Sequence, residues 1–244
     1  MIDLNCDMGE QPDTDGYLRD ESLMPYLGSC SIACGGHAGN ADSMRITAKN
    51  AIKHDLRLGA HPSYPDPEHF GRRALDIESE ELSCSLAEQI TELKLIVEDL
   101  GSKLSYVKPH GALYNTAATD RHLSRLILET VRHIEPDLPL MGLAGSETQA
   151  LCLELGYPFI AEGFADRAYQ RDGNLVPRSE TGAVHSDVAR VVNQVAQMAN
   201  KRPVESLCGH RVELAVQSIC VHSDTNNAKA MLQAIQAALL PDAS

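Results

Sequence analysis

Short apolar runs alternate with longer amphipathic segments along most of the chain. The short runs predict buried strands, and the longer segments predict helices because their apolar positions recur every three or four residues. Leu82, Leu86, Ile90, Leu93 and Val97 show this helical spacing most clearly. The predicted strands cover residues 2–4, 29–33, 56–60, 106–108, 138–143, 159–161 and 217–221, and the predicted helices cover 41–54, 79–100, 119–134, 146–155, 186–198 and 224–240.

Serine residues mark the predicted starts of three helices. Ser79, Ser146 and Ser186 each precede an amphipathic segment, and a serine oxygen at this position accepts a hydrogen bond from a free backbone N–H. The polar segments 5–22 and 162–185 lack an apolar period, so we expect both to be loops.

Strands that alternate with helices predict an α/β fold with a parallel sheet and right-handed connections. Seven such units fit either an open doubly wound sheet or a closed barrel. The chain has 244 residues, of which 43% are hydrophobic, and no linker-like tract interrupts it. We therefore expect a single domain over residues 1–244.

The charge balance limits the classes of partner. A net charge of −13 argues against nucleic acid and anionic membranes as partners. No apolar stretch is long enough to predict a membrane-spanning helix. Seven cysteines at irregular spacing, together with an amino terminus unlike a signal peptide, indicate a reduced, cytoplasmic protein. Whether the chain forms a homo-oligomer is left open.

Polar and ionisable residues follow six of the seven predicted strands. These residues are Asn5 and Asp7, His37, His61, Lys108 and His110, Glu162 and Asp166, and His222 and Asp224. In a closed parallel barrel the carboxyl ends of all strands converge on one mouth, where barrel enzymes place their active sites. In an open sheet they converge only at the switch point. The recurrence therefore favours a closed barrel and an enzyme, although loops are commonly polar for other reasons.

Two histidines lie in turns that proline or glycine stiffens. Ala60-His61-Pro62 and Pro109-His110-Gly111 would present each ring rigidly, as a metal ligand or an acid–base group requires. The alternative is a histidine bonded to a nearby carbonyl. Asp7, His37, His61 and His222 together offer mixed nitrogen and oxygen ligands that suit Zn²⁺, Mn²⁺ or Fe²⁺.

Several features point to an anionic ligand. The glycine-rich segment 35–39 would let backbone amides approach a phosphate or carboxylate, or would simply form a tight turn. Arg72, Arg73, Arg167 and Arg178 lie in the two longest loops, and arginine pairs well with both anions. No standard phosphate-binding loop occurs, so a nucleotide would need another kind of pocket. Cys34 is interpreted as a buried, inert thiol rather than a nucleophile.

These polar segments carry a resemblance to the LamB/YcsF family, in order, from residue 3 to about residue 235. The matching segments are 3–10 (DLNCDMGE), 32–39 (IACGGHAG), 59–62 (GAHP), 70–73 (FGRR), 107–115 (VKPHGALYN), 162–167 (EGFADR), 175–178 (LVPR) and 219–225 (ICVHSDT). Two positions depart from the family pattern, which usually has Asp where this chain has Asn40 and Gly where it has Ser223.

The resemblance implies a seven-stranded (β/α) barrel related to the glycoside hydrolase and deacetylase superfamily. It also implies an ATP-dependent 5-oxoprolinase that opens 5-oxo-L-proline to L-glutamate, with Mg²⁺ accompanying ATP. The chain would then be the A subunit of a complex with separate B and C subunits. The alternative is a stand-alone, metal-dependent deacetylase or amidohydrolase.

With this activity in view, the polar residues receive expected roles. Asp7 or Glu162 is expected to be the base, and His61, His110 and His222 to supply acids or oxyanion contacts. The remaining expected substrate and phosphate contacts are Asn5, His37, Arg72, Lys108, Asp166, Arg167, Arg178 and Asp224.

Overall fold

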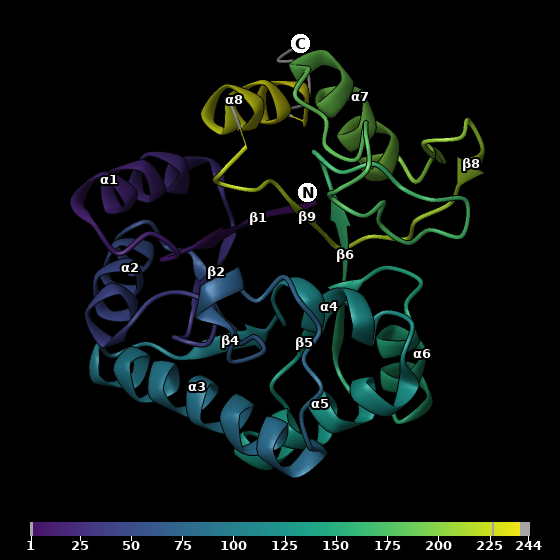
Figure 1. Ribbon diagram of the computed structural model, residues 1–244. Helices are drawn as coiled ribbons and strands as arrows, with labels where there is room; N and C mark the ends of the chain where they lie inside the picture. Colours follow the sequence, from purple (N-terminus) through teal and green to yellow (C-terminus); the bar gives the residue numbers. More distant parts are fainter. Residues whose placement is uncertain (1, 226, 240–244) are drawn as a thin grey trace.

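The structure is a computed structural model that describes residues 2–225 and 227–239. Seven parallel strands close into a barrel in the order β1-β2-β3-β4-β5-β6-β9, with helices around its outside (Figure 1). The predicted closed barrel is therefore confirmed. Its strands are β1 (Asp3–Met8), β2 (Ser29–Ala33), β3 (Arg57–His61), β4 (Leu104–Val107), β5 (Leu140–Leu143), β6 (Phe159–Phe164) and β9 (Ser218–Cys220).

Side chains along β1 alternate between two environments. Leu4 and Met8 belong to the apolar core, whereas Asn5 and Asp7 make polar contacts with residues of other strands. This alternation is the pattern expected of a barrel strand with one face on the helices and one face inside. The sequence prediction ended this strand at residue 4, because its inward positions are polar and resemble a loop.

The barrel interior is also crossed by a tyrosine. Tyr106 on β4 lies 3.2 Å from the Ser31 hydroxyl on β2, and these strands are not neighbours in the barrel. The ring passes so close to Gly59 on β3 that a Cβ atom there would lie 2.1 Å from a Tyr106 ring carbon. Glycine is therefore required at position 59 to admit the ring.

Helices surround the barrel and form most of the apolar core against its strands. Helix α8 packs against both α7 and α1, so the carboxyl-terminal and amino-terminal parts of the helical layer meet (Figure 1). The helices are α1 (Thr14–Leu23), α2 (Ala41–Lys53), α3 (Ser79–Asp99), α4 (Gly111–Ala117), α5 (Arg121–Ile134), α6 (Glu147–Glu154), α7 (Val188–Ala199) and α8 (Ala228–Leu239).

Two helices and one hairpin were absent from the sequence prediction. The predicted loop 5–22 contains α1, whose buried Asp20 accepts a hydrogen bond from the Gly9 N–H, 2.9 Å away. Because α1 buries a carboxylate, it lacks the apolar period of a helix. Helix α4 has only 7 residues, too few to show a helical period in the sequence. The hairpin consists of β7 (Val204–Glu205) and β8 (Arg211–Val212), which pair in a separate two-stranded sheet.

The helix caps confirm one prediction and correct two. Ser146 caps α6 by accepting from the Gln149 N–H. Ser79 is instead the first residue of α3, and α7 is capped by Asp187 rather than Ser186. Aspartate competes well with serine for this position, so the pattern alone placed the start of α7 one residue early.

Candidate active site

A cavity of about 540 Å³ lies at the carboxyl ends of the barrel strands. Nine of the predicted site residues line it, which places polar residues from the ends of five strands and the loops that follow them around one space. The nine are Asp7, His61, Arg72, Lys108, His110, Arg167, Arg178, His222 and Asp224. The structure therefore brings together side chains that are up to 217 positions apart in the sequence, since Asp7 and Asp224 face the same cavity.

The other four predicted residues are buried behind this lining. Each of them contacts a side chain that does face the cavity. Asn5 and Glu162 contact Lys108, His37 contacts Glu10, and Asp166 contacts His222. These four residues can support the lining side chains, but their direct contact with a ligand stays a prediction.

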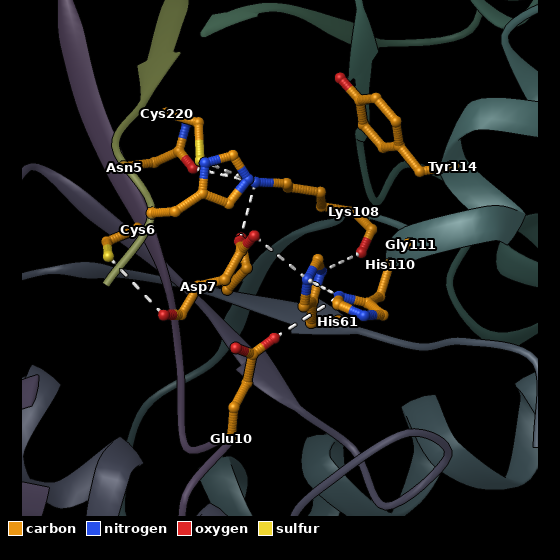
Figure 2. A network of polar contacts seen from close by, with 12 residues as sticks. Asn5, Cys6, Asp7, Glu10, His61, Lys108, His110, Gly111, Tyr114 and Cys220 are labelled. Atoms are coloured by element: carbon orange, nitrogen blue, oxygen red, sulfur yellow. Dashed lines mark hydrogen bonds and ion pairs between the residues drawn. The ribbon is translucent and has the colours of Figure 1, made fainter. Parts of the chain in front are cut away.

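Lys108 lies at the centre of the barrel mouth (Figure 2). Its Nζ is 2.8 Å from Asp7 Oδ1, 2.8 Å from Glu162 Oε1 and 3.2 Å from Asn5 Oδ1. Burial lowers the pKa of Lys108, but the carboxylates of Asp7 and Glu162 outweigh it and raise the pKa well above its usual value. The ammonium is therefore a fixed positive charge at the cavity floor.

Glu162 is fully buried, and both of its carboxylate oxygens accept from neighbouring side chains. Its Oε1 accepts from Asn5 and Lys108, and its Oε2 accepts from the Tyr114 hydroxyl at 2.8 Å. A carboxylate with this many partners and no exposed surface is suited to holding Lys108 and Tyr114 in place. Of the two predicted bases, only Asp7 lines the cavity.

His61 and His110 meet at one side of the cavity floor (Figure 2). His110 Nδ1 lies 3.0 Å from His61 Nε2. The turn that carries His110 requires glycine at position 111, where φ is +56° and a Cβ atom would lie 2.5 Å from the Gly71 carbonyl oxygen. The prediction of a rigid turn at this histidine is consistent with that close approach.

Glu10 and His37 complete the histidine cluster. His37 stacks on His110 with ring centroids 3.6 Å apart, and its Nε2 lies 3.1 Å from Glu10 Oε1. Burial lowers the pKa of both His37 and His110 well below the usual value, and the neighbouring histidines add to the effect. Burial also raises the pKa of Glu10. The cluster thus holds several ionisable groups with little access to water.

On the other side of the cavity, His222 and Asp166 form an acid–base unit that is separate from the histidine cluster. Its Nδ1 lies 2.9 Å from Asp166 Oδ1, and Thr225 Oγ1 donates to Asp166 Oδ2. A carboxylate accepts only, so His222 Nδ1 carries the hydrogen and Nε2 is left for a ligand. Burial raises the pKa of Asp166, but His222, Thr225 and Arg178 lower it to about 2.

The arginines divide into a buried one and two at the rim. Arg167 is buried and donates to the carbonyl oxygens of Val176 and Ala183, so it clamps the loop that follows β6. Arg72 is half-exposed, lies over the Phe70 ring and pairs with Asp224 at 3.3 Å. Arg178 is exposed and also lines the cavity, and its contact with an anionic ligand stays a prediction.

The predicted metal-ligand set is divided between two clusters. His37 and His61 group with Glu10 and His110, with one potential ligand atom from each lying within 4.8 Å of the others. Asp7 and His222 group instead with Cys220. The four predicted residues therefore do not form one ligand set, because His222, which follows β9, groups apart from His61 at the end of β3 and from His37 after β2.

Sequence reasoning missed Glu10, Tyr114 and Cys220. Glu10 follows β1 by two residues, and the prediction that this strand ends at residue 4 placed it far inside a loop. Tyr114 lies on α4, the helix that was not predicted. Cys220 ends β9 with its Sγ 3.5 Å from Lys108 Nζ, and no local pattern in the sequence signals that contact.

Three other sequence features have structural roles. Cys34 is buried, and its thiol donates to the Ile32 carbonyl oxygen, which agrees with an inert thiol. Gly35 and Gly39 have positive φ in a tight turn closed by a bond from the Gly35 N–H to the Ala38 carbonyl oxygen. Asn40, one of the two departures, caps α2 by accepting from the Ser43 N–H. An aspartate would serve equally well there.

The second departure, Ser223, is buried at the cavity wall. It lies between His222 and Asp224, so its added side chain adjoins the acid–base unit. The cysteines at all seven positions are free. Among the helices within residues 2–225 and 227–239, none is both long and apolar enough to cross a membrane.

The fold and the cavity define a (β/α) barrel of the kind that places an active site at the carboxyl ends of its strands. The family model for the LamB/YcsF family matches residues 2–243. The chain belongs to this family, and the resemblance found in its sequence motifs is confirmed.

Individual relatives agree with this assignment. The chain is 45% identical over 226 residues to a protein from Haemophilus influenzae strain PittEE that is named as the A subunit of 5-oxoprolinase, covering 93% of this chain and 90% of that one. A lactam utilization protein from Thermus thermophilus has a similar structure, with a TM-score of 0.89, 34% identity and coverage of 98% and 95%. A chitinase from Pseudoalteromonas aurantia, at 11% identity, has a TM-score of 0.52 and coverage of 97% and 100%, which shows likeness of fold alone.

Proposed function

We propose that this chain is the A subunit of an ATP-dependent 5-oxoprolinase and opens 5-oxo-L-proline to L-glutamate. In this reaction the lactam C–N bond breaks, the carbonyl carbon gains the oxygen of water, and the ring nitrogen gains a proton. Hydrolysis of Mg-ATP to ADP and phosphate drives the reaction. The names of the relatives support the substrate, and their designation as one lettered subunit of an enzyme supports an assembly with B and C subunits.

The observation that carries the proposal is the Asp166–His222 pair beside a cavity that also exposes Lys108. Asp166 holds Nδ1 of His222, which leaves Nε2 to move a proton between water and the leaving ring nitrogen. Such acid–base help is worth about 10²–10⁴-fold in rate. A resonance-stabilised amide needs it at the nitrogen, which is a poor leaving group unless protonated.

Positive charge in the cavity suits the substrate and the charge that develops on it. Lys108 lies at the floor, while Arg72 and Arg178 lie at the rim. An arginine at the rim would hold the carboxylate of 5-oxoproline through paired hydrogen bonds. The N–H groups of Lys108 point to Asp7, Asn5 and Glu162, so its fixed charge would stabilise negative charge on the lactam oxygen through space, without reorganising during the reaction.

The test is isothermal titration of 5-oxoproline and of Mg-ATP into the chain alone, and then into the chain mixed with its B and C subunits. The rate of ATP-coupled glutamate formation by the same complex is measured as well, and we expect His222→Gln to lower it about 10²–10⁴-fold. The exposed His133→Gln is the matched control and should leave the rate unchanged. Binding of neither ligand under any condition would refute the substrate assignment. Glutamate formation at the same rate without ATP would favour the stand-alone hydrolase.

A further inference from the structure

Two backbone carbonyl groups fix the tautomers of His61 and His110. His61 Nδ1 lies 2.7 Å from the Lys108 carbonyl oxygen, and His110 Nε2 lies 3.0 Å from the Phe70 carbonyl oxygen. A carbonyl oxygen only accepts, so both of these ring nitrogens must carry hydrogen. In a neutral imidazole the other nitrogen then carries a lone pair.

The two remaining nitrogens face each other. His61 Nε2 and His110 Nδ1 are 3.0 Å apart, and both rings are buried. Two lone pairs at this separation repel each other and leave two buried acceptors without a donor, which is costly. A cation that both nitrogens contact removes the conflict.

Glu10 supplies a third ligand atom at the same place. Its Oε1 lies 3.5 Å from His110 Nδ1. Ligand atoms about 2.1 Å from one metal ion are about 3.0–3.4 Å from each other in octahedral or tetrahedral geometry, which matches the two separations. His37, from behind, places its Nε2 3.1 Å from Glu10 Oε1 and orients the carboxylate, as supporting partners of metal ligands do.

The second cluster, formed by Asp7, Cys220 and His222, already has a cation. Lys108 Nζ is 2.8 Å from Asp7 Oδ1 and 3.5 Å from Cys220 Sγ (Figure 2). Asp166 holds Nδ1 of His222. The ammonium therefore contacts two acceptors of this cluster, Asp7 Oδ1 and Cys220 Sγ. Asp7 Oδ2, by contrast, lies 3.4 Å from His61 Nε2, so a further acceptor rather than a donor faces the nitrogens of His61 and His110.

We propose that Glu10, His61 and His110 bind one divalent transition-metal ion at the floor of the cavity. Two imidazoles and one carboxylate suit Zn²⁺, Mn²⁺ or Fe²⁺. All three residues line the cavity, so the coordination positions not filled by protein face the ligand space. The carboxyl groups of Asp7 and Glu10 at the floor, and of Glu162 just behind it, outnumber the ammonium of Lys108 that they surround, and a dication there offsets the excess negative charge.

The ion would polarise an oxygen of the substrate or lower the pKa of a bound water. This use rests on the proposed function, whereas binding of the ion does not. With a lactam in the cavity, the ion on one side and His222 on the other would act on the two ends of the scissile amide, at oxygen and at nitrogen. The metal thus gives a role to Glu10, His61 and His110, the residues of the cavity that the Asp166–His222 pair does not involve.

The test uses the purified full chain after removal of metal by chelator, titrated with Zn²⁺ and, separately, with Co²⁺. We expect one ion per chain by calorimetry and elemental analysis, and a visible Co²⁺ absorption band typical of nitrogen and oxygen ligands. Glu10→Gln and His110→Asn should each weaken Zn²⁺ binding by about 100-fold or more, since loss of even a supporting partner costs about 10–100-fold. The matched controls, Glu129→Gln and His122→Asn, replace exposed residues of α5 and should bind as the unsubstituted chain does.

The outcomes are distinct from those of the activity assay because metal binding is measured without substrate or ATP. Circular dichroism of each variant identifies any that fail to fold, and the Co²⁺ spectrum of the unsubstituted chain then carries the test. Absence of a stoichiometric ion in the titrated chain would overturn the proposal, and would mean that a proton joins the two facing nitrogens. Binding unchanged in folded Glu10→Gln and His110→Asn would also overturn it.

Discussion

The ammonium of Lys108 lies 2.8 Å from the carboxylate of Glu162, with only 2% and 0% of the two side chains exposed. Such an ion pair loses the water around both charges, and short contacts and further hydrogen bonds must offset the free energy of that loss. Asn5 and Tyr114 provide those bonds on the Glu162 side. The pair therefore makes the charge at the cavity floor a fixed part of the barrel.

Replacement of Lys108 by methionine should strongly destabilise the protein. It leaves Asp7 and Glu162 buried without their cation, and a broken buried pair costs about 3–5 kcal/mol. Urea unfolding followed by circular dichroism measures this loss. The double variant Lys108→Met/Glu162→Gln should be more stable than Lys108→Met alone, because one uncompensated charge is removed with it.

Lys103→Met is the control for the same chemical change, because Lys103 is exposed next to β4. It should alter the free energy of unfolding by less than about 0.5 kcal/mol. A loss below about 1 kcal/mol in Lys108→Met would show that the pair is not the buried, mutually dependent unit described above.

Asp166→Asn should reduce stability in a pH-dependent manner. Since the folded protein lowers the pKa of Asp166 from 3.8 to about 2, the ionised carboxylate contributes about 2–3 kcal/mol. The pKa is lower in the folded state, so this contribution is complete above about pH 5 and is lost as the pH falls from about 4 through about 2. Urea unfolding at about pH 7, 5 and 3 should give a difference in the free energy of unfolding between the unsubstituted protein and Asp166→Asn. This difference should be the same at the two higher pH values and smaller at the lowest. The same difference in unfolding free energy at all three pH values would contradict this contribution of the ionised carboxylate.

The alternation of strands and helices predicted a parallel sheet, and the polar residues after six of the predicted strands favoured the closed barrel. The lengths of the strands were not predicted equally well. β2 was predicted with its observed bounds because its inward serines are small and its other positions are apolar. β1 was cut short because Asn5 and Asp7 point inward and are polar. A barrel interior lined by functional groups removes the apolar signal from the strands that carry the site.

Convergence of the strand ends at one mouth predicted which residues form the site. It did not predict their division into the histidine cluster and the Asp166–His222 pair. Spacing along the chain places His61, His110 and His222 at one mouth. It does not reveal which carbonyl or carboxylate each ring contacts. Those partners, such as Phe70 for His110 and Asp166 for His222, come from loops whose path depends on tertiary packing. They determine which nitrogen of each ring faces the cavity.

Gly59→Ala should destabilise the barrel by overpacking. Its new Cβ would lie 2.1 Å from a carbon of the Tyr106 ring, which must then move, at a cost of about 1–3 kcal/mol. Tyr106→Val on its own should destabilise by leaving a cavity. Combined, the two changes should be less harmful than their sum, because the alanine occupies part of the space that the ring leaves. Urea unfolding of the four proteins measures this coupling, and simple additivity would show that the ring does not set the requirement for glycine.

Cys208 should be the most reactive thiol of the protein at neutral pH. It is exposed beyond β7, with its Sγ 3.4 Å from Ser206 Oγ and 3.3 Å from His210 Nδ1. Hydrogen bonds from Ser206 and His210 stabilise the thiolate and lower the pKa of Cys208 to about 7.

Alkylation by iodoacetamide, quantified by peptide mass spectrometry, should therefore be half-maximal near a pH of about 7 at Cys208. Exposed Cys84 on α3 serves as the reference thiol in the same sample and should react more slowly at that pH. His210→Ala removes one of the two hydrogen bonds, so the midpoint for Cys208 should move up toward about 8.5, the value of an ordinary thiol. Equal rates at the two cysteines, or a midpoint that His210→Ala leaves in place, would show that the hairpin does not stabilise the thiolate. Because Cys208 lies outside the residues that line the cavity, its alkylation should leave Zn²⁺ binding at Glu10, His61 and His110 unchanged.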